Sequence, residues 1–193
     1  MRLFAAVAIP PEIREAVARL RDGWLRSPEA PKGARRVKPA NLHLTLKFFG
    51  EVPETLVPAL SGALERSVRG RKKFTLALGG TGFFPEKGRP RVLWLGVPDP
   101  AQSGALTDLA AAVERETLSS GFPPADRSFS PHLTLARLEA PPGPGFEKVL
   151  GETSGRIVAE TAVDRIFLIE SRLRPGGAGP EYQDVSAHVF DDH

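Results

Sequence analysis

The chain has 193 residues, 41% of them apolar and 25% charged, so it is long enough to bury a core and has an ordinary globular composition. It contains no cysteine, which excludes disulfides, thiolate nucleophiles and cysteine metal sites and fits the cytoplasmic location that we expect. The formal net charge of +3 is too small to identify a nucleic-acid-binding protein by itself.

The first half of the chain predicts strands alternating with helices. The apolar run at the N-terminus is too short to cross a membrane or to act as a signal peptide, and Pro10 and Pro11 end it. In chain order we expect a strand at Leu3–Ile9, a helix with Ile13, Val17, Leu20 and Trp24 on its apolar face, a loop at Pro28–Pro39, a strand at Leu42–Phe49 and a helix at Pro53–Val68.

The second half repeats this mixed order. We expect strands at Phe74–Leu78 and Arg91–Val97, a helix at Ala105–Leu118, a strand at Phe129–Leu138, a short helix at Phe146–Leu150, and strands at Ile157–Ala159, Asp164–Ser171 and Tyr182–Phe190. The stretch G-G-T-G-F-F-P-E-K-G-R-P reads as a loop, R-P-G-G-A-G-P reads as another, and Trp94 is expected in the core. Mixed elements occurring twice favour an α+β pair of lobes over a run of βαβ units.

The tetrapeptide H-L-T-L occurs twice, beginning at His43 and at His132, and so accounts for two of the four histidines. Because side chains alternate along a strand, His43 and Thr45 share one face, as do His132 and Thr134, while the leucines occupy the other. Either motif alone reads as an ordinary half-buried strand. An ordinary core strand has no reason to repeat the same polar pair, so the repetition indicates a functional site.

Two imidazoles flanking one cleft suit displacement at phosphorus. The ordinary histidine pKa of about 6.5 lets one ring accept a proton from water while the other protonates the leaving oxygen. Threonine hydroxyls can donate hydrogen bonds to phosphate oxygens as negative charge develops on them. We expect such a site to need no metal and no other cofactor.

The two motifs and their flanks resemble the 2H phosphoesterase superfamily. The branch that they resemble is the RNA 2',3'-cyclic phosphodiesterases of bacteria and archaea, also called 2'-5' RNA ligases. The matching stretches are R-L-F-A-A-V-A-I-P-P, N-L-H-L-T-L-K-F-F-G-E-V, R-V-L-W-L-G-V, F-S-P-H-L-T-L-A-R and E-S-R-L-R-P-G-G. They run in order through nearly the whole chain.

This resemblance implies that residues 1–193 form one bilobal domain. Its two pseudo-symmetric lobes would have antiparallel sheets facing a central, positively lined cleft, with helices outside. The resemblance also implies an enzyme that opens a 2',3'-cyclic phosphate at an RNA end, or in a small cyclic nucleotide, to a 2'-phosphomonoester, and we expect a monomer. In that reaction His43 would be the proton donor and His132 the proton acceptor. Thr45, Thr134 and Arg137 would bind the phosphate.

Two positions depart from the expected pattern. Strict alternation from His132 places Arg137 on the opposite face, so Arg137 reaches the cleft only if the strand twists or bulges. The family often has an aromatic residue, commonly Trp, before the first motif, where this chain has Arg36 and Val37. By alternation Phe49 shares the face of His43 and could stack on a base, but we favour packing of Phe48 and Phe49 in the core.

Other features carry weaker expectations. The glycine-rich stretch lacks the G-K-[ST] ending of a P-loop, so we expect a mobile loop beside the cleft. His188 and His193 have no motif partner and are expected to be structural or at the surface. Two basic clusters, one around the first motif and one near residue 70, read as solvated surface. Their members are Lys32, Arg35, Arg36, Lys38 and Lys47, and Arg69, Arg71, Lys72 and Lys73.

Four functions remain to be compared. The first is a metal-independent phosphodiesterase for RNA 2',3'-cyclic phosphates. The second is a ligase that runs the reverse reaction with an RNA 5'-hydroxyl, which abundant water disfavours. The third is a non-catalytic module that binds RNA ends, which would not need both histidines. A metal hydrolase is the fourth, and the sequence offers neither H-E-x-x-H nor carboxylates at ligand spacing beside the histidines.

Overall fold

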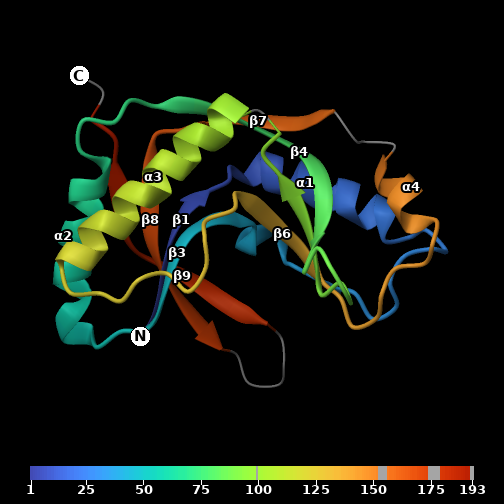
Figure 1. Cartoon of the computed structure of the whole chain (residues 1–193), viewed down its shortest axis with the longest axis horizontal. Helices are drawn as coiled ribbons and strands as arrows, with labels where there is room; N and C mark the ends of the chain where they lie inside the picture. Colours follow the sequence, from blue (N-terminus) through green and yellow to red (C-terminus); the bar gives the residue numbers. More distant parts are fainter. Residues whose placement is uncertain (99, 152–155, 174–178, 192–193) are drawn as a thin grey trace.

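The computed structural model describes residues 1–98, 100–151, 156–173 and 179–191 (Figure 1). The strands are β1 (Arg2–Ala8), β2 (Arg35–Arg36), β3 (His43–Glu51), β4 (Phe74–Phe84), β5 (Val92–Gly96), β6 (His132–Arg137), β7 (Ile157–Val163), β8 (Arg165–Leu173) and β9 (Pro180–Val189). The helices are α1 (Pro11–Trp24), α2 (Val57–Val68), α3 (Pro100–Ser119) and α4 (Phe146–Gly151), with 3-10 turns η1 (Pro39–Asn41) and η2 (Glu54–Leu56). Within the described ranges, no helix combines the length and the apolar character needed to span a membrane.

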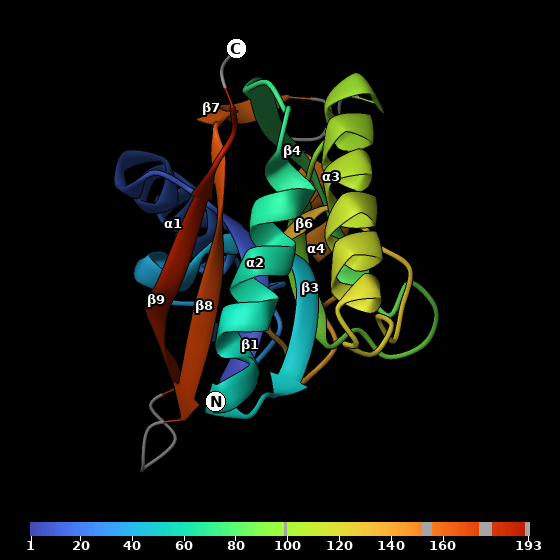
Figure 2. The same cartoon turned by 90° about the vertical axis from the view of Figure 1, so that its left-hand side faces the viewer.

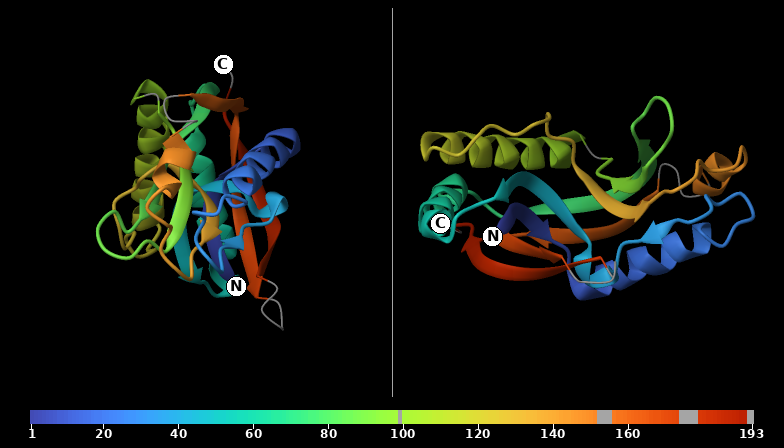
Figure 3. Two further views of the ribbon diagram at one scale, coloured as in Figure 1. Left: turned by 90° about the vertical axis from the view of Figure 1, so that its right-hand side faces the viewer. Right: turned by 90° about the horizontal axis from the view of Figure 1, so that it is seen from below.

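The strands form an antiparallel sheet in the order β7-β4-β5-β6-β3-β1-β8-β9, and β2 pairs with β6. This order divides into two groups of four strands, which meet where β6 pairs with β3. Helices α2 and α3 lie side by side; α2 packs on β8 and β9, α3 contacts β3 of one group and β4 of the other, and α1 and α4 lie at the end of the molecule away from α2 (Figures 2 and 3). The α+β architecture with two lobes is therefore confirmed.

The duplication seen in the sequence is also a duplication of strand register. In the first half, β1 and β3 pair through Ala8–His43, Val7–Leu44, Ala6–Thr45, Ala5–Lys47 and Phe4–Phe48. In the second half, β5 and β6 pair through Gly96–His132, Leu95–Leu133, Trp94–Thr134, Leu93–Ala136 and Val92–Arg137. Both ladders skip the last leucine of the motif, Leu46 or Leu135, which is a β-bulge at the same place.

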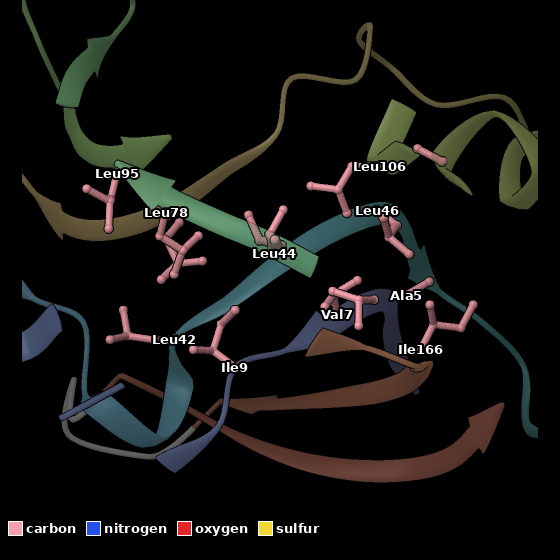
Figure 4. Close-up of a cluster of buried hydrophobic side chains, with 14 of the residues drawn as sticks. Ala5, Val7, Ile9, Leu42, Leu44, Leu46, Leu78, Leu95, Leu106 and Ile166 are labelled. Carbon is pink, nitrogen blue, oxygen red and sulfur yellow. The ribbon is translucent and has the colours of Figure 1, made fainter. Parts of the chain in front are cut away.

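The two halves share one hydrophobic core at the junction of the motifs. Leu44 pairs with Leu133, and both side chains are fully buried. Figure 4 shows Leu44 between Leu78 and Leu95 from one half and Val7 from the other. Because the motif leucines are held on this face, alternation directs the motif histidines and threonines to the opposite face.

Strand β4 continues through the stretch that the sequence suggested was a mobile loop. It runs to Phe84 and pairs with β5, so that expectation is wrong. A Cβ atom on Gly82 would lie 2.2 Å from the ring of Trp94, so glycine is needed for the close approach of an indole. The glycines that resembled loop residues therefore serve a strand. The predicted R-P-G-G-A-G-P loop lies mostly in residues 174–178, outside the described residues.

Candidate active site

The four polar side chains of the two motifs lie together on one face of the central strand pair. His43 and Thr45 come from β3, and His132 and Thr134 come from β6. The antiparallel pairing of Leu44 with Leu133 places His43 towards Thr134, and His132 towards Thr45, across the junction. All four are half-buried and still in contact with solvent, and together they form the surface that we call the recess. The predicted convergence of the two motifs is confirmed.

Each motif imidazole is oriented by the same hydrogen bond. His43 Nδ1 lies 2.7 Å from the carbonyl oxygen of Asn41, and His132 Nδ1 lies 2.7 Å from that of Ser130. Because a carbonyl can only accept, each Nδ1 carries the hydrogen and Nε2 is left to exchange protons. His43 Nε2 is 3.0 Å from Thr45 Oγ1, which donates to the neutral ring.

Aromatic rings surround both imidazoles. The ring centroids of Phe4 and Tyr182 are 4.8 and 5.2 Å from that of His43. On the other side, the Phe84 centroid is 4.8 Å from that of His132. These rings replace water around the imidazoles, and removal of water disfavours the charged form of histidine.

Burial accordingly lowers the pKa of both histidines. Burial is the largest cause that lowers the pKa of His43 to about 4, repulsion from His132 adds to it, and the Asn41 carbonyl opposes it. Burial also lowers the pKa of His132 below its ordinary value, against the opposing effect of the Ser130 carbonyl. Both rings are therefore neutral at pH 7 in the free protein. An anion bound between them would favour protonation of one.

Trp94 lies on the histidine face, so its prediction as a core residue is wrong. It is half-buried opposite Thr134 and packs on Phe84, with the two ring centroids 5.4 Å apart. At the matching register of the first half, Ala6 stands in place of Trp94, and Phe167 stands beside it in place of Gly82. A large aromatic side chain therefore stands on β5 in the second half, next to the motif strand, and on β8 in the first half, one strand further away. Because the side chains of β5 are all apolar, its sequence shows no alternation from which the face of Trp94 could be predicted.

The bulge at Leu135 returns Arg137 to the face of His132. Leu135 and Ala136 are both fully buried, and Arg137, the next residue, is exposed. The bulged Leu135 carbonyl accepts a hydrogen bond from the Val37 amide at 2.9 Å. Burial raises the pKa of Tyr182, whose ring contacts that of His43, and the nearby positive charge of Arg137 opposes this rise. No carboxylate of the described residues pairs with Arg137. The bulge that the Arg137 prediction required is therefore present.

The corresponding bulge at Leu46 places Phe49 in the core. Phe49 is 8% exposed, and its ring centroid is 6.0 Å from that of Phe122. Alternation that ignores the bulge wrongly assigned Phe49 to the histidine face, so its suggested role in base stacking fails. Phe48 takes that face instead and is 67% exposed. The favoured expectation of core packing is right for Phe49 and wrong for Phe48.

Several residues of the basic cluster around the first motif point away from the histidines or are already paired. Lys47 is buried under α3, where its Nζ lies 2.7 Å from Glu114 Oε2. Arg35 pairs with Glu139 at 2.7 Å, and Arg36 pairs with Asp22 at 3.1 Å. Three of the five residues of the first basic cluster are therefore engaged elsewhere, and Arg137 is a cation that the strand geometry brings to the recess.

The remaining histidines and acidic residues do not extend the site. His188 is buried, with Nδ1 3.0 Å from Glu65 Oε2 and Nε2 2.9 Å from Ser186 Oγ, which confirms a structural role between α2 and β9. His193 lies outside the described residues. Where the chain is described, no three His, Asp or Glu side chains are arranged to hold a metal ion.

Open volume adjoins each motif. A cavity of about 700 Å³ lies beside His43, and its walls include Arg14, Tyr182 and Asp184. A smaller cavity of about 380 Å³ adjoins the start of β6, with Trp94 and Ser130 in its wall. Space for parts of a ligand beyond the reacting group is therefore present on both sides of the junction.

Comparison with known proteins agrees with this geometry. Residues 9–175 match the model of a family described as the 2'-5' RNA ligase superfamily. The chain belongs to the 2'-5' RNA ligase superfamily. Among curated relatives, an RNA 2',3'-cyclic phosphodiesterase of Methanothermobacter thermautotrophicus is 34% identical over 186 residues, 96% of each chain. One of Escherichia coli is 38% identical over 150 residues, 75% of this chain and 78% of the relative.

Two solved structures have the same fold as this chain. TT0787 of Thermus thermophilus aligns with a TM-score of 0.71 and 32% identity, covering 98% of each chain. E. coli LigT complexed with 3'-AMP aligns with a TM-score of 0.72 and 31% identity, covering 98% of this chain and 97% of LigT. The resemblance drawn from the motifs is thus confirmed for the family and the fold.

The lowered pKa values predict the order in which the histidines titrate. In the free protein, His43 should stay neutral as the pH falls to about 4, and His132 should protonate below pH 6.5. Nitrogen-15 NMR of the imidazoles, with His43→Gln and His132→Gln for assignment, measures both values. A His43 ring that is charged at pH 6 would contradict the proposed effect of burial.

Proposed function

We propose that this protein hydrolyses RNA 2',3'-cyclic phosphate ends to 2'-phosphomonoesters, with two histidines as acid and base and without a metal. The observation that carries the proposal is the paired placement of His43 and His132 on one face, each with Nδ1 fixed and Nε2 available. Membership of the superfamily and the names of its curated relatives support the substrate class.

The reaction assigns one proton transfer to each ring. His132 Nε2 accepts a proton from water, the water oxygen attacks phosphorus, and the bond from phosphorus to O3' breaks. His43 donates the proton that O3' needs, and the phosphate remains on O2'. The pseudo-symmetry makes the two rings similar in geometry, so this division of roles rests on the family resemblance.

The negative charge of the substrate would favour protonation of His43, which must carry a proton to act as the acid. A cyclic phosphate diester carries one negative charge, and an anion beside an imidazole favours its protonated form. Bound substrate would therefore raise the pKa of His43 from about 4. The Thr45 hydroxyl, which donates to His43 in the free protein, would turn to a phosphate oxygen once the ring is protonated.

Thr134 and Arg137 would stabilise the other phosphate oxygens. Thr134 lies on the histidine face, and the bulge brings Arg137 to the same face without a carboxylate partner among the described residues. A hydrogen bond from a guanidinium to a phosphate is stronger than one between neutral groups, and its strength grows as charge builds on phosphorus.

Substitution of either motif histidine tests the proposal. His43→Ala and His132→Ala should each lower kcat by about 10²–10⁴-fold, the usual contribution of a general acid or base. Activity is measured on an RNA with a 2',3'-cyclic phosphate end in excess EDTA, with circular dichroism as the check on folding. His188→Gln, outside the recess, is the matched control and should keep its activity. Substantial turnover by either motif variant, or loss of wild-type turnover in EDTA, would refute the scheme.

Arg137→Gln tests the consequence of the bulge. Loss of a charged hydrogen bond to phosphate costs about 1.5–3 kcal/mol, so kcat/KM should fall by about tenfold to a hundredfold. Arg19→Gln, which removes an exposed arginine on α1, is the matched control and should leave kcat/KM unchanged. Equal kinetics for the two variants would show that Arg137 does not reach the phosphate.

A further inference from the structure

The cavity beside His43 lies where the upstream part of a bound RNA would leave the recess. In a ribose, the carbon that bears O3' is joined to C4', which carries the 5' chain. The carbon that bears O2' is joined to C1', which carries the base. Because His43 is the acid for O3' under the proposed function, the 5' chain leaves on the His43 side. The cavity there measures about 700 Å³, within the range of about 300–1,000 Å³ that is usual for ligand pockets.

Three segments distant in sequence form the wall of this cavity, and hydrogen bonds join them. Arg14 of α1 donates from Nη1 to the carbonyl oxygen of Ala40 in η1, at 3.0 Å. Asn41 donates from Nδ2 to a carbonyl oxygen at the start of β9, at 2.8 Å, and its own carbonyl holds His43 Nδ1. Tyr182 of β9 packs its ring on that of His43. The wall is therefore fixed by the same contacts that orient the imidazole.

Arg14 is the cation that this wall offers to a phosphate. Its side chain is half-buried, and no carboxylate of the described residues forms an ion pair with it. A guanidinium has five N–H donors, so the bond to Ala40 leaves others for an anion. Arg165 also lines the cavity, but it is already paired with Asp164, with Nε 2.8 Å from Oδ1. A phosphate in the cavity would therefore bind at Arg14.

The smaller cavity at the start of β6 has a different chemistry. No charged side chain is among the described residues of its wall, which include Trp94, Val97, Pro98 and Pro131. Removing a negatively charged phosphodiester from water is costly unless a charged or hydrogen-bonding partner replaces the water. Of these two cavities, the one beside His43 thus has the larger volume and the cation that an upstream nucleotide requires.

We propose that the cavity beside His43 is a subsite for the penultimate nucleotide of the RNA, in which Arg14 binds the phosphodiester that joins the last two nucleotides. This proposal rests on the proposed function, and in particular on His43 as the acid for O3'. The subsite makes the enzyme favour RNA ends over mononucleoside cyclic phosphates.

The side chains of β9 suit the uncharged part of that nucleotide. Tyr182, Gln183 and Asp184 all line the cavity. An amide donates and accepts hydrogen bonds, and a carboxylate accepts them from ribose hydroxyls and from amino groups of bases. Because the carboxylate of Asp184 repels an anion, the phosphodiester lies at Arg14 and the sugar and base lie along β9.

The test compares three substrates that share a terminal adenosine 2',3'-cyclic phosphate. They are the mononucleoside, the dinucleotide with an ordinary phosphodiester, and the same dinucleotide with an uncharged methylphosphonate linkage. Wild type should prefer the phosphodiester to the methylphosphonate by about threefold to tenfold in kcat/KM, mainly through KM, because Arg14 is partly solvated. Arg14→Gln should abolish this preference, and Arg14→Lys should keep part of it. Arg19→Gln, an exposed arginine on the same helix, is the matched control and should keep it fully.

A wild-type enzyme that hydrolyses the phosphodiester dinucleotide no better than the mononucleoside would overturn the proposal, as would a preference that survives in Arg14→Gln. Failure on all three substrates would instead refute the proposed function, so the subsite is also tested by binding. The dinucleotide that ends in a 2'-phosphate is titrated into each protein by calorimetry. Binding that weakens by about threefold to tenfold in Arg14→Gln supports the subsite. Equal affinity for both proteins, or no binding by wild type, overturns it.

Discussion

The structure depends on one backbone contact, the antiparallel pairing of Leu44 with Leu133. Both leucines are fully buried in a core that the two halves share. Since alternation along a strand leaves no other choice, their burial turns His43 and His132 to the opposite face. A slip of one residue in either strand would turn the motif leucines to the histidine face and the histidine into the core. The same packing that joins the halves therefore also assembles the site.

The paired bulges add the second element of the site. An extra residue in a strand reverses the alternation beyond it, and both halves carry that residue at the last motif leucine. Beyond the bulge, one half returns Phe48 to the histidine face and the other returns Arg137. The duplication thus kept the backbone and the two motif histidines symmetric while the outer positions diverged into an aromatic and a charged group.

The sequence predicted most of what depends on local pattern. The repeated motif indicated the site, alternation gave the faces of His43 and Thr45, and helical spacing located α1. The failures arose where pairing between strands decides the outcome. Phe49 was misplaced because a bulge is set by the partner strand, and Gly82 resembled a loop residue because its neighbour Trp94 is distant in sequence.

Charge and burial were the other properties that the sequence did not convey. Lys47 looked like part of a basic cluster, yet it is buried and paired with Glu114 beneath α3. The low pKa of His43 depends on rings contributed by β1 and β9, which no local pattern assigns to it. These surroundings leave both motif histidines uncharged in the free protein, so under the proposed mechanism substrate binding and formation of the acid are linked.

The central claim is that this recess opens a cyclic phosphate by breaking its bond to O3'. The most direct measurement incubates the protein, in excess EDTA, with a short RNA that ends in a 2',3'-cyclic phosphate. The products are then separated by chromatography beside authentic 2'- and 3'-phosphate standards. The account predicts that the cyclic end is converted to a 2'-phosphate. A 3'-phosphate product, or a cyclic end that survives intact, would contradict it.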